Sequence, residues 1–198
     1  MTAQTQANWT DEDETAILNA IDKWVEGEVR PIAREHDQAD SYPHELVEQM
    51  KELGLFGAII SPNYGGLGLP ASTYAKIVLK VAAAWMAPSG IFNSHLIMAS
   101  AIERTGTEEQ KAEWLPKMAT GELRGGIALT EPNAGTDLQA IRTKAEKTNE
   151  GYRLNGTKTW ITNSLNGNCL MILAKTDPEA EPRHKGMSAF LAKKGEGY

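Results

Sequence analysis

The chain has 198 residues, of which 41% are hydrophobic and 23% charged, values that fit a globular protein and exclude a disordered or collagen-like chain. Twenty Lys and Arg residues against 26 Asp and Glu give a net charge of −6, which argues against nucleic acid as the main partner. The single cysteine, Cys169, allows no internal disulfide and favours a reducing compartment. None of the four histidines is spaced with it as a ligand pair, so no metal site is expected.

The first predicted helix begins at Thr10, because Thr10 and Asp13 match a capping box. Apolar residues then recur at helical spacing up to Pro31, which should end or kink the helix. Pro43 suits the first turn of a second helix, and Gly54 is a natural residue to follow its end.

A loop and three further helices are predicted next. Turn-forming residues between Ser61 and Pro70 indicate an ordered loop. Helices resume near Ser72 and again from Gly90 to Glu103. Residues 107–110 form a second capping box, and the helix that it opens should finish near Gly121.

Residues 81–102 carry no formal charge, and a segment of this length is long enough to cross a bilayer. Pro88-Ser89-Gly90 interrupts the run, however, and Asn93-Ser94-His95 adds three polar side chains. We therefore expect two buried helices joined by a tight turn, and no integral membrane segment. The first residues lack the basic start and apolar core of a signal peptide, so a cytoplasmic protein is predicted.

Strands are predicted after Gly125, with a type I′ hairpin turn at Asn155-Gly156. Four runs are rich in apolar or β-branched residues: Ile127–Thr130, Thr157–Thr162, Cys169–Ala174 and Met187–Ala192. Helices followed by strands predict an α+β fold of two segregated parts. The boundaries are 1–123 for an all-helical domain and 124–198 for a β domain.

A polar cluster runs from Leu129 to Asp137. Glu131-Pro132 should end a strand, and Asn133-Ala134-Gly135 should turn the chain. The resulting loop presents backbone amides and hydroxyls suited to polar ring edges or carbonyl oxygens. On composition alone, an ordered turn without a binding role is the favoured interpretation of this cluster.

A second cluster runs from Thr157 to Asn163. On a strand, Lys158, Trp160 and Thr162 would share one face, since side chains alternate. An indole beside a hydroxyl can shield a planar ring and bond to it. Taken alone, the cluster favours the alternative in which Trp160 simply fills the core of the β domain.

Together the two clusters resemble the signature segments of the acyl-CoA dehydrogenase family. The matching residues are Ala128–Asp137 and Asn155–Asn163, in the family's order and spacing. Upstream, Glu52–Gly57, Asn63–Gly68 and Gly106–Lys111 resemble segments of the family's helical domain. The resemblance extends from residue 10 to the end of the chain.

The resemblance implies a helical domain, a middle β-barrel-like domain and a C-terminal bundle, with FAD between the last two. Thr130 should bond to the pyrimidine edge of the flavin and Thr162 should lie near N5. Thr136, where most members have serine, should touch both flavin and acyl-CoA. The implied cofactor-binding residues are Ile127, Leu129, Thr130, Gly135, Thr136, Trp160 and Thr162.

The implied reaction is α,β-dehydrogenation of an acyl-CoA thioester, with hydride transfer to N5. In the family a glutamate of the C-terminal bundle takes the α-proton, so Glu131 and Asp137 are interpreted as structural. By this resemblance the chain stops at Tyr198, partway through the middle domain. We therefore expect that it contains no catalytic residue, that FAD binding is weak or absent, and that the chain alone is inactive. The implied partners are an electron-transferring flavoprotein and, for the full-length protein, further copies of itself.

The acyl tail should lie along the segment Ile91–Ser100. This segment contains no Arg or Lys, which disfavours a dicarboxyl-CoA substrate. His95 can contact substrate there, but a hydrogen-bonded core position is the favoured interpretation.

Two alternatives to a dehydrogenase remain open at the level of sequence. One is a related flavin oxidase or monooxygenase of the same superfamily. The other is a non-catalytic truncated module that serves in binding or as a scaffold.

Overall fold

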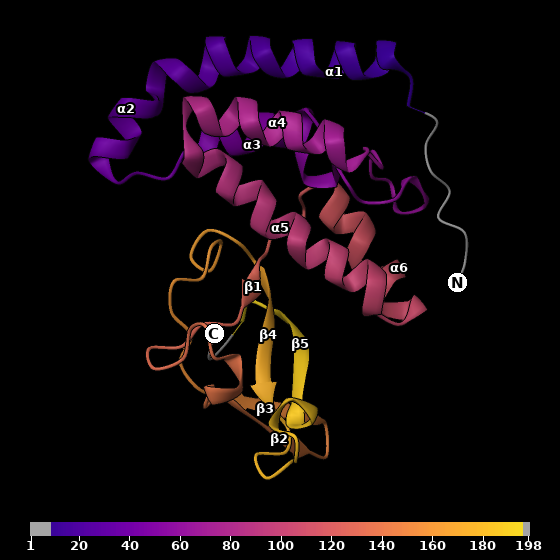
Figure 1. The fold of residues 1–198 in the computed structure, drawn as a ribbon, viewed down its shortest axis with the longest axis vertical. Coiled ribbons are helices and arrows are strands. Elements are labelled where there is room, and N and C mark those ends of the chain that lie inside the picture. The colour runs from indigo at the N-terminus through magenta and orange to yellow at the C-terminus, as the bar shows by residue number, and fades with distance from the viewer. Residues whose placement is uncertain (1–8, 196–198) are drawn as a thin grey trace. The chain divides into compact units, whose positions relative to one another are not determined.

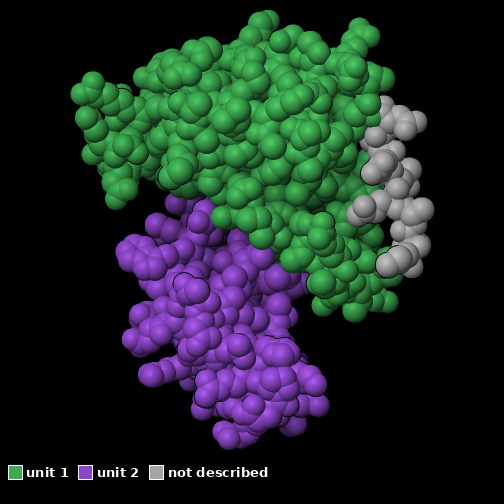
Figure 2. Space-filling view, in the orientation of Figure 1, with its two compact units in different colours: residues 1–123 green, residues 124–198 purple. Residues whose placement is uncertain are grey.

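All α-helices precede all β-strands in the computed structural model, which describes residues 9–195 (Figure 1). The chain divides into two compact units, Met1–Leu123 and Arg124–Tyr198 (Figure 2). The first unit is helical and the second contains a mixed sheet. The predicted α+β class is therefore confirmed.

The first helix continues past Trp24 without a break. Helix α1 (Asp11–Trp24) begins with the predicted capping box, and helix α2 (Arg30–Ala39) ends at Asp40 in the left-handed conformation. Between them, Val25–Val29 form a π-helical turn in which Arg30 N donates to Val25 O. Pro31 has no N–H to donate, and this wider π-helical turn comes directly before it. The helix therefore does not end at Pro31 but continues through the π-helical turn into α2.

The remaining helices follow the predicted caps closely. Helix α3 (His44–Glu52) starts after Pro43, and Gly54 adopts a φ of +69° just beyond its end. Helix α6 (Glu108–Ala119) begins with the second capping box, as predicted.

The junction between helix α4 (Ala71–Ala84) and helix α5 (Met86–Thr105) lies at Trp85. The predicted turn at residues 88–90 is therefore wrong. Trp85 makes the break with a φ of −161° and a ψ of +122°. Pro88 instead occupies the first turn of α5, where its missing N–H removes no helical bond. Within residues 9–195, no helix is long and apolar enough to span a membrane.

The core of the helical unit includes one histidine. His95 is fully buried, and its Nε2 lies 3.1 Å from the carbonyl oxygens of both Phe56 and Met118. The predicted core position of His95 is therefore confirmed. The core also contains large apolar side chains with almost no exposed surface: Met50, Phe56, Phe92, Leu96, Met98, Leu115 and Met118.

The sheet is built on β4 (Cys169–Lys175), its most buried strand. Strand β5 (Met187–Lys193) pairs antiparallel with the whole length of β4. Strands β1 (Ile127–Ala128) and β2 (Lys144–Thr148) both pair with β4 in parallel, so they share its other edge at different heights. Strand β3 (Gly151–Asn155) pairs with β2.

Two predictions for the β unit are wrong. The hairpin turn lies at Asn149-Glu150, between β2 and β3, and not at Asn155-Gly156. Gly156 instead lies against Thr143, where a Cβ would come within 2.3 Å of Oγ1. The predicted strand at 157–162 is irregular chain.

The loop 61–70 folds back onto residues 57–60 through backbone hydrogen bonds. Leu67 N donates to Gly57 O and Gly68 N to Ile60 O. At Gly66 a Cβ would lie 2.1 Å from the Ile60 carbonyl oxygen, so only glycine permits this approach.

Gly66→Ala should therefore destabilise the helical unit by about 3 kcal/mol, since rigid backbone must move to admit the methyl group. Gly90→Ala is the matched control, because a Cβ there meets nothing within 4 Å and alanine favours helix by about 1 kcal/mol. Urea unfolding followed by helical circular dichroism checks both. Equal stabilities would contradict the close approach at Gly66.

Candidate functional site

Two loops that carry the sequence motifs lie together in the β unit. We call residues 129–137 motif loop 1 and residues 156–163 motif loop 2. Thr159 N donates to Thr130 O over 3.0 Å, and Lys158 Nζ donates to Leu129 O over 2.9 Å. The two motifs are thus joined side by side by direct hydrogen bonds.

The carboxylate of Glu131 fixes this junction. Its Oε1 accepts from Lys158 Nζ and from Thr143 N, each over 2.9 Å, and its Oε2 accepts from Arg142 N over 2.6 Å. The side chains of Glu131 and Lys158 are only 6% and 10% exposed. Glu131 also forms a backbone bridge with Ala134 within motif loop 1.

The environment of Glu131 keeps it ionised. Burial by itself would raise the pKa of this carboxyl, but hydrogen bonds from Thr143, Arg142 and Lys158 outweigh it and lower the pKa to about 2. A carboxylate with so low a pKa is a poor proton acceptor at neutral pH. The geometry therefore makes Glu131 a positioning residue.

The predicted site residues fall into two groups. Ile127 lies in β1, and Leu129 and Thr130 are half-buried at the junction of the loops. The exposed group comprises Gly135, Thr136, Trp160 and Thr162.

Trp160 projects away from the protein. It is 90% exposed and has a φ of +59°, a left-handed conformation that is costly for a large side chain. Lys158 points inward to Glu131, so the predicted shared face of Lys158, Trp160 and Thr162 is wrong. The alternative in which Trp160 fills the core is also wrong.

Two asparagines hold motif loop 2 and the chain that follows it in place. The sequence alone assigns no role to either of them. Asn163 Nδ2 donates to Gly125 O, and Asn168 Oδ1 accepts from Arg124 N, each over 2.8 Å. Asn163 has a φ of +67°, a left-handed conformation that Asn adopts more readily than most residues. These bonds tie the loop to the segment that leads into β1.

Four exposed positions in the loops leave hydrogen-bonding groups open. In the described part of the chain, no hydrogen bond reaches the backbone amides of Gly135, Thr136, Trp160 or Thr162, nor the two threonine hydroxyls. Residues 9–195 also contain no cluster of three side chains that could hold a metal ion. The arrangement can cover a planar ring with an indole and donate hydrogen bonds to its polar edges.

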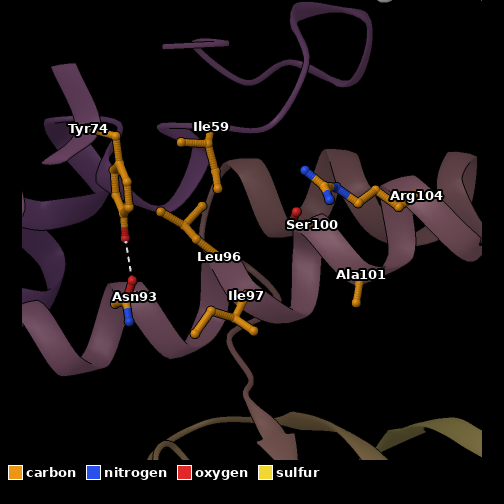
Figure 3. Close-up of a pocket in the computed structure, with 8 residues that line it drawn as sticks. All are labelled: Ile59, Tyr74, Asn93, Leu96, Ile97, Ser100, Ala101 and Arg104. Carbon is orange, nitrogen blue, oxygen red and sulfur yellow. Dashed lines mark hydrogen bonds between the residues drawn. The ribbon is translucent and has the colours of Figure 1, made fainter. Parts of the chain in front are cut away.

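A separate pocket of about 340 Å³ lies in the helical unit (Figure 3). Most of its wall comes from helix α5. Its apolar residues are Ile59, Leu96, Ile97 and Ala101, and its polar residues are Tyr74, Asn93, Ser100 and Arg104. The pocket therefore includes part of the segment 91–100 that the sequence predicts to contact the acyl tail.

Family comparisons agree with this two-part architecture. The model "Acyl-CoA dehydrogenase, N-terminal domain" matches residues 11–122, and "Acyl-CoA dehydrogenase, middle domain" matches residues 126–197. The fold and the two matches thus define the N-terminal and middle parts of an acyl-CoA dehydrogenase architecture. The chain belongs to the acyl-CoA dehydrogenase family.

Individual relatives are similar over almost the whole chain. Mitochondrial isovaleryl-CoA dehydrogenase of Pongo abelii is 33% identical over 95% of this chain and 45% of its own length. The short-chain specific acyl-CoA dehydrogenase of Clostridium acetobutylicum is 38% identical over 95% of this chain and 49% of its own. The chain therefore spans about half the length of these relatives.

A solved structure shares the fold. The glutaryl-CoA dehydrogenase of Mycobacterium smegmatis in complex with FADH2 has a TM-score of 0.82 and 30% sequence identity. The alignment covers 93% of this chain and 46% of that one.

Lys158→Met should destabilise the β unit by about 3 kcal/mol, because it leaves the buried carboxylate of Glu131 without its cation. Adding Glu131→Gln to this variant should recover part of the loss. Lys147→Met, at an exposed position in β2, is the control and should change little. Hydrogen exchange of the β4 amides measures each effect, and equal protection in all variants would contradict the role of the ion pair.

The stability of the β unit should also depend on pH through Glu131. Folding lowers the pKa of this group from 4.5 to about 2, so its ionised form favours the fold. This contribution, about 3 kcal/mol, is present above pH 4.5 and is lost as the pH falls towards 2. The stability derived from amide exchange should fall less steeply across this pH range in Glu131→Gln than in the wild type. Identical pH profiles of the two proteins would refute the assignment.

Proposed function

We propose that this chain provides the flavin-contacting loops and the acyl-binding helical unit of an FAD-dependent acyl-CoA dehydrogenase. The reaction is α,β-dehydrogenation of an acyl-CoA thioester. The observation that carries this proposal is the pair of motif loops, locked together at Glu131 and presenting an uncovered indole and open hydrogen-bond donors. Membership of the family gives the substrate class.

The residues of the motif loops fit a flavin. A flavin is a planar ring with carbonyl and nitrogen acceptors along its edges, and Trp160 offers an exposed flat surface with unsatisfied groups beside it. FAD would be held by the residues implied from the sequence: Ile127, Leu129, Thr130, Gly135, Thr136, Trp160 and Thr162. When bound, it supplies the hydride acceptor at N5.

The polar residues of the motif loops have the following proposed roles. Thr130 and Thr136 donate to the pyrimidine edge, and Thr162 donates near N5, which stabilises negative charge in that region. Thr136 also contacts the acyl-CoA. Glu131 holds these groups in place and does not take the α-proton, because its oxygens accept three hydrogen bonds and its pKa is about 2.

The acyl group is assigned to the pocket on α5. The pocket wall includes Leu96 and Ile97 on the segment expected to contact the acyl tail, and an apolar wall favours burial of a hydrocarbon chain. Electron-transferring flavoprotein as electron acceptor and assembly into a homo-oligomer complete the proposal for the whole protein.

Titration of the chain with FAD tests the site. Trp160→Ala should weaken FAD binding about tenfold through loss of stacking, measured by flavin fluorescence. Leu165→Ala is a matched control, since Leu165 is 80% exposed on the adjoining segment but belongs to neither motif loop. Equal effects of the two substitutions on FAD binding would contradict the proposed site.

A further inference from the structure

The pocket in the helical unit contains one charged side chain. Among the eight residues that line it, only Arg104 is charged. In Figure 3 its guanidinium is directed back along α5 towards Ser100, with Leu96 and Ile97 between it and Asn93. Residues 93 and 104 are three helical turns apart, so the lined stretch of α5 is roughly 16 Å long. An elongated ligand with one anionic end matches this distribution.

Arg104 has no bonded partner among the residues that the structure describes. No ion pair or hydrogen bond to its side chain occurs within residues 9–195. The adjacent Glu103 does not line the pocket; burial raises its pKa, and Arg104 and Lys111 act on it in the opposite direction. The guanidinium is therefore available to a ligand in the pocket.

The polar pair at the other end of the pocket is satisfied internally. Tyr74 OH donates to Asn93 Oδ1 over 2.8 Å, as the dashed line in Figure 3 marks. Burial raises the pKa of Tyr74 to about 12, so the hydroxyl stays neutral and remains a donor. This pair holds the side chains in place and offers no charge to a ligand.

We propose that the pocket accepts acyl groups whose terminal carbon bears a carboxylate, with Arg104 as the residue that determines this specificity. The inference rests on the proposed function of the pocket as the acyl site. The proposal is opposite to the sequence-based expectation, which disfavours a dicarboxyl-CoA substrate because the segment 91–100 contains no Arg or Lys. Arg104 lies one helical turn beyond that segment, and its side chain extends back along the helix.

The chemistry of Arg104 explains the preference. A guanidinium can donate two parallel hydrogen bonds to one carboxylate, a match that a methyl-ended chain lacks. The remaining wall is mostly apolar and suits the methylene groups of either chain. Because Arg104 is exposed to solvent, its attraction is partly screened, and the expected discrimination is modest.

Calorimetric titration of the chain with adipoyl-CoA and hexanoyl-CoA tests the proposal, because these ligands have equal carbon number and differ in the terminal carboxylate. The wild-type chain should bind adipoyl-CoA about fivefold more tightly than hexanoyl-CoA. Arg104→Gln should bring the two affinities together by weakening the binding of adipoyl-CoA. Arg34→Gln removes one exposed positive charge from α2, outside the pocket, and should keep the wild-type ratio. Circular dichroism checks that all variants are folded.

The outcomes separate the two proposals. If hexanoyl-CoA binds but the ratio of affinities is the same in wild type and Arg104→Gln, the role of Arg104 is wrong while the acyl site stands. If Arg34→Gln reduces the ratio of affinities as much as Arg104→Gln does, the preference comes from long-range attraction by net charge. This result also overturns the role of Arg104. If neither ligand binds the wild-type chain, both the proposed acyl site and the specificity inferred from it are wrong.

Discussion

The buried carboxylate of Glu131 is the interaction on which the arrangement of the β unit depends. It binds the backbone at Arg142 and Thr143 and the ammonium of Lys158, and its own peptide group bridges to Ala134. Three stretches of chain that are distant in sequence therefore meet at one side chain. A buried charge is tolerated only where its partners are complete, so the geometry of all three stretches is strongly constrained.

This constraint allows the outer side of the motif loops to remain unsatisfied. Trp160 is exposed and left-handed, a conformation that persists when its neighbours fix the backbone. Those neighbours are Lys158 and Thr159 on one side and Asn163 on the other, each bonded to another segment. The conformational entropy of the loops is thus lost on folding and not on binding. The groups on the outer side of the loops are therefore in place before any ligand arrives.

Features set by neighbouring residues could be predicted from the sequence, and features set by distant contacts could not. The caps at Thr10 and Thr107 and the helix end at Gly54 depend on residues within one turn, and they occur where predicted. Gly156 was misread as a turn because its need for glycine comes from Thr143 across the fold. Trp160 was misread because its β-branched neighbours suggest a strand, whereas Lys158 turns inward to Glu131.

The same reasoning applies to the candidate site. The family motifs predict which loops contact the cofactor, but they contain no information about which donors in these loops already have a hydrogen-bond partner. Arg104 lay outside the segment considered for the substrate, and its inclusion in the pocket depends on the length and direction of its side chain. Which groups of the site lack a partner therefore cannot be predicted from the sequence, because it depends on the three-dimensional arrangement.

The parallel pairing of β4 has a consequence for the order of events during synthesis. Ile127 and Lys144 pair with residues of β4, which leave the ribosome only after both earlier strands have emerged. The helices of the first unit form from local bonds and can assemble meanwhile. β2 can pair with β3 as soon as both have emerged, but β1 must wait with unpaired backbone until β4 arrives. This interval is when the nascent chain is most exposed to strand-mediated association.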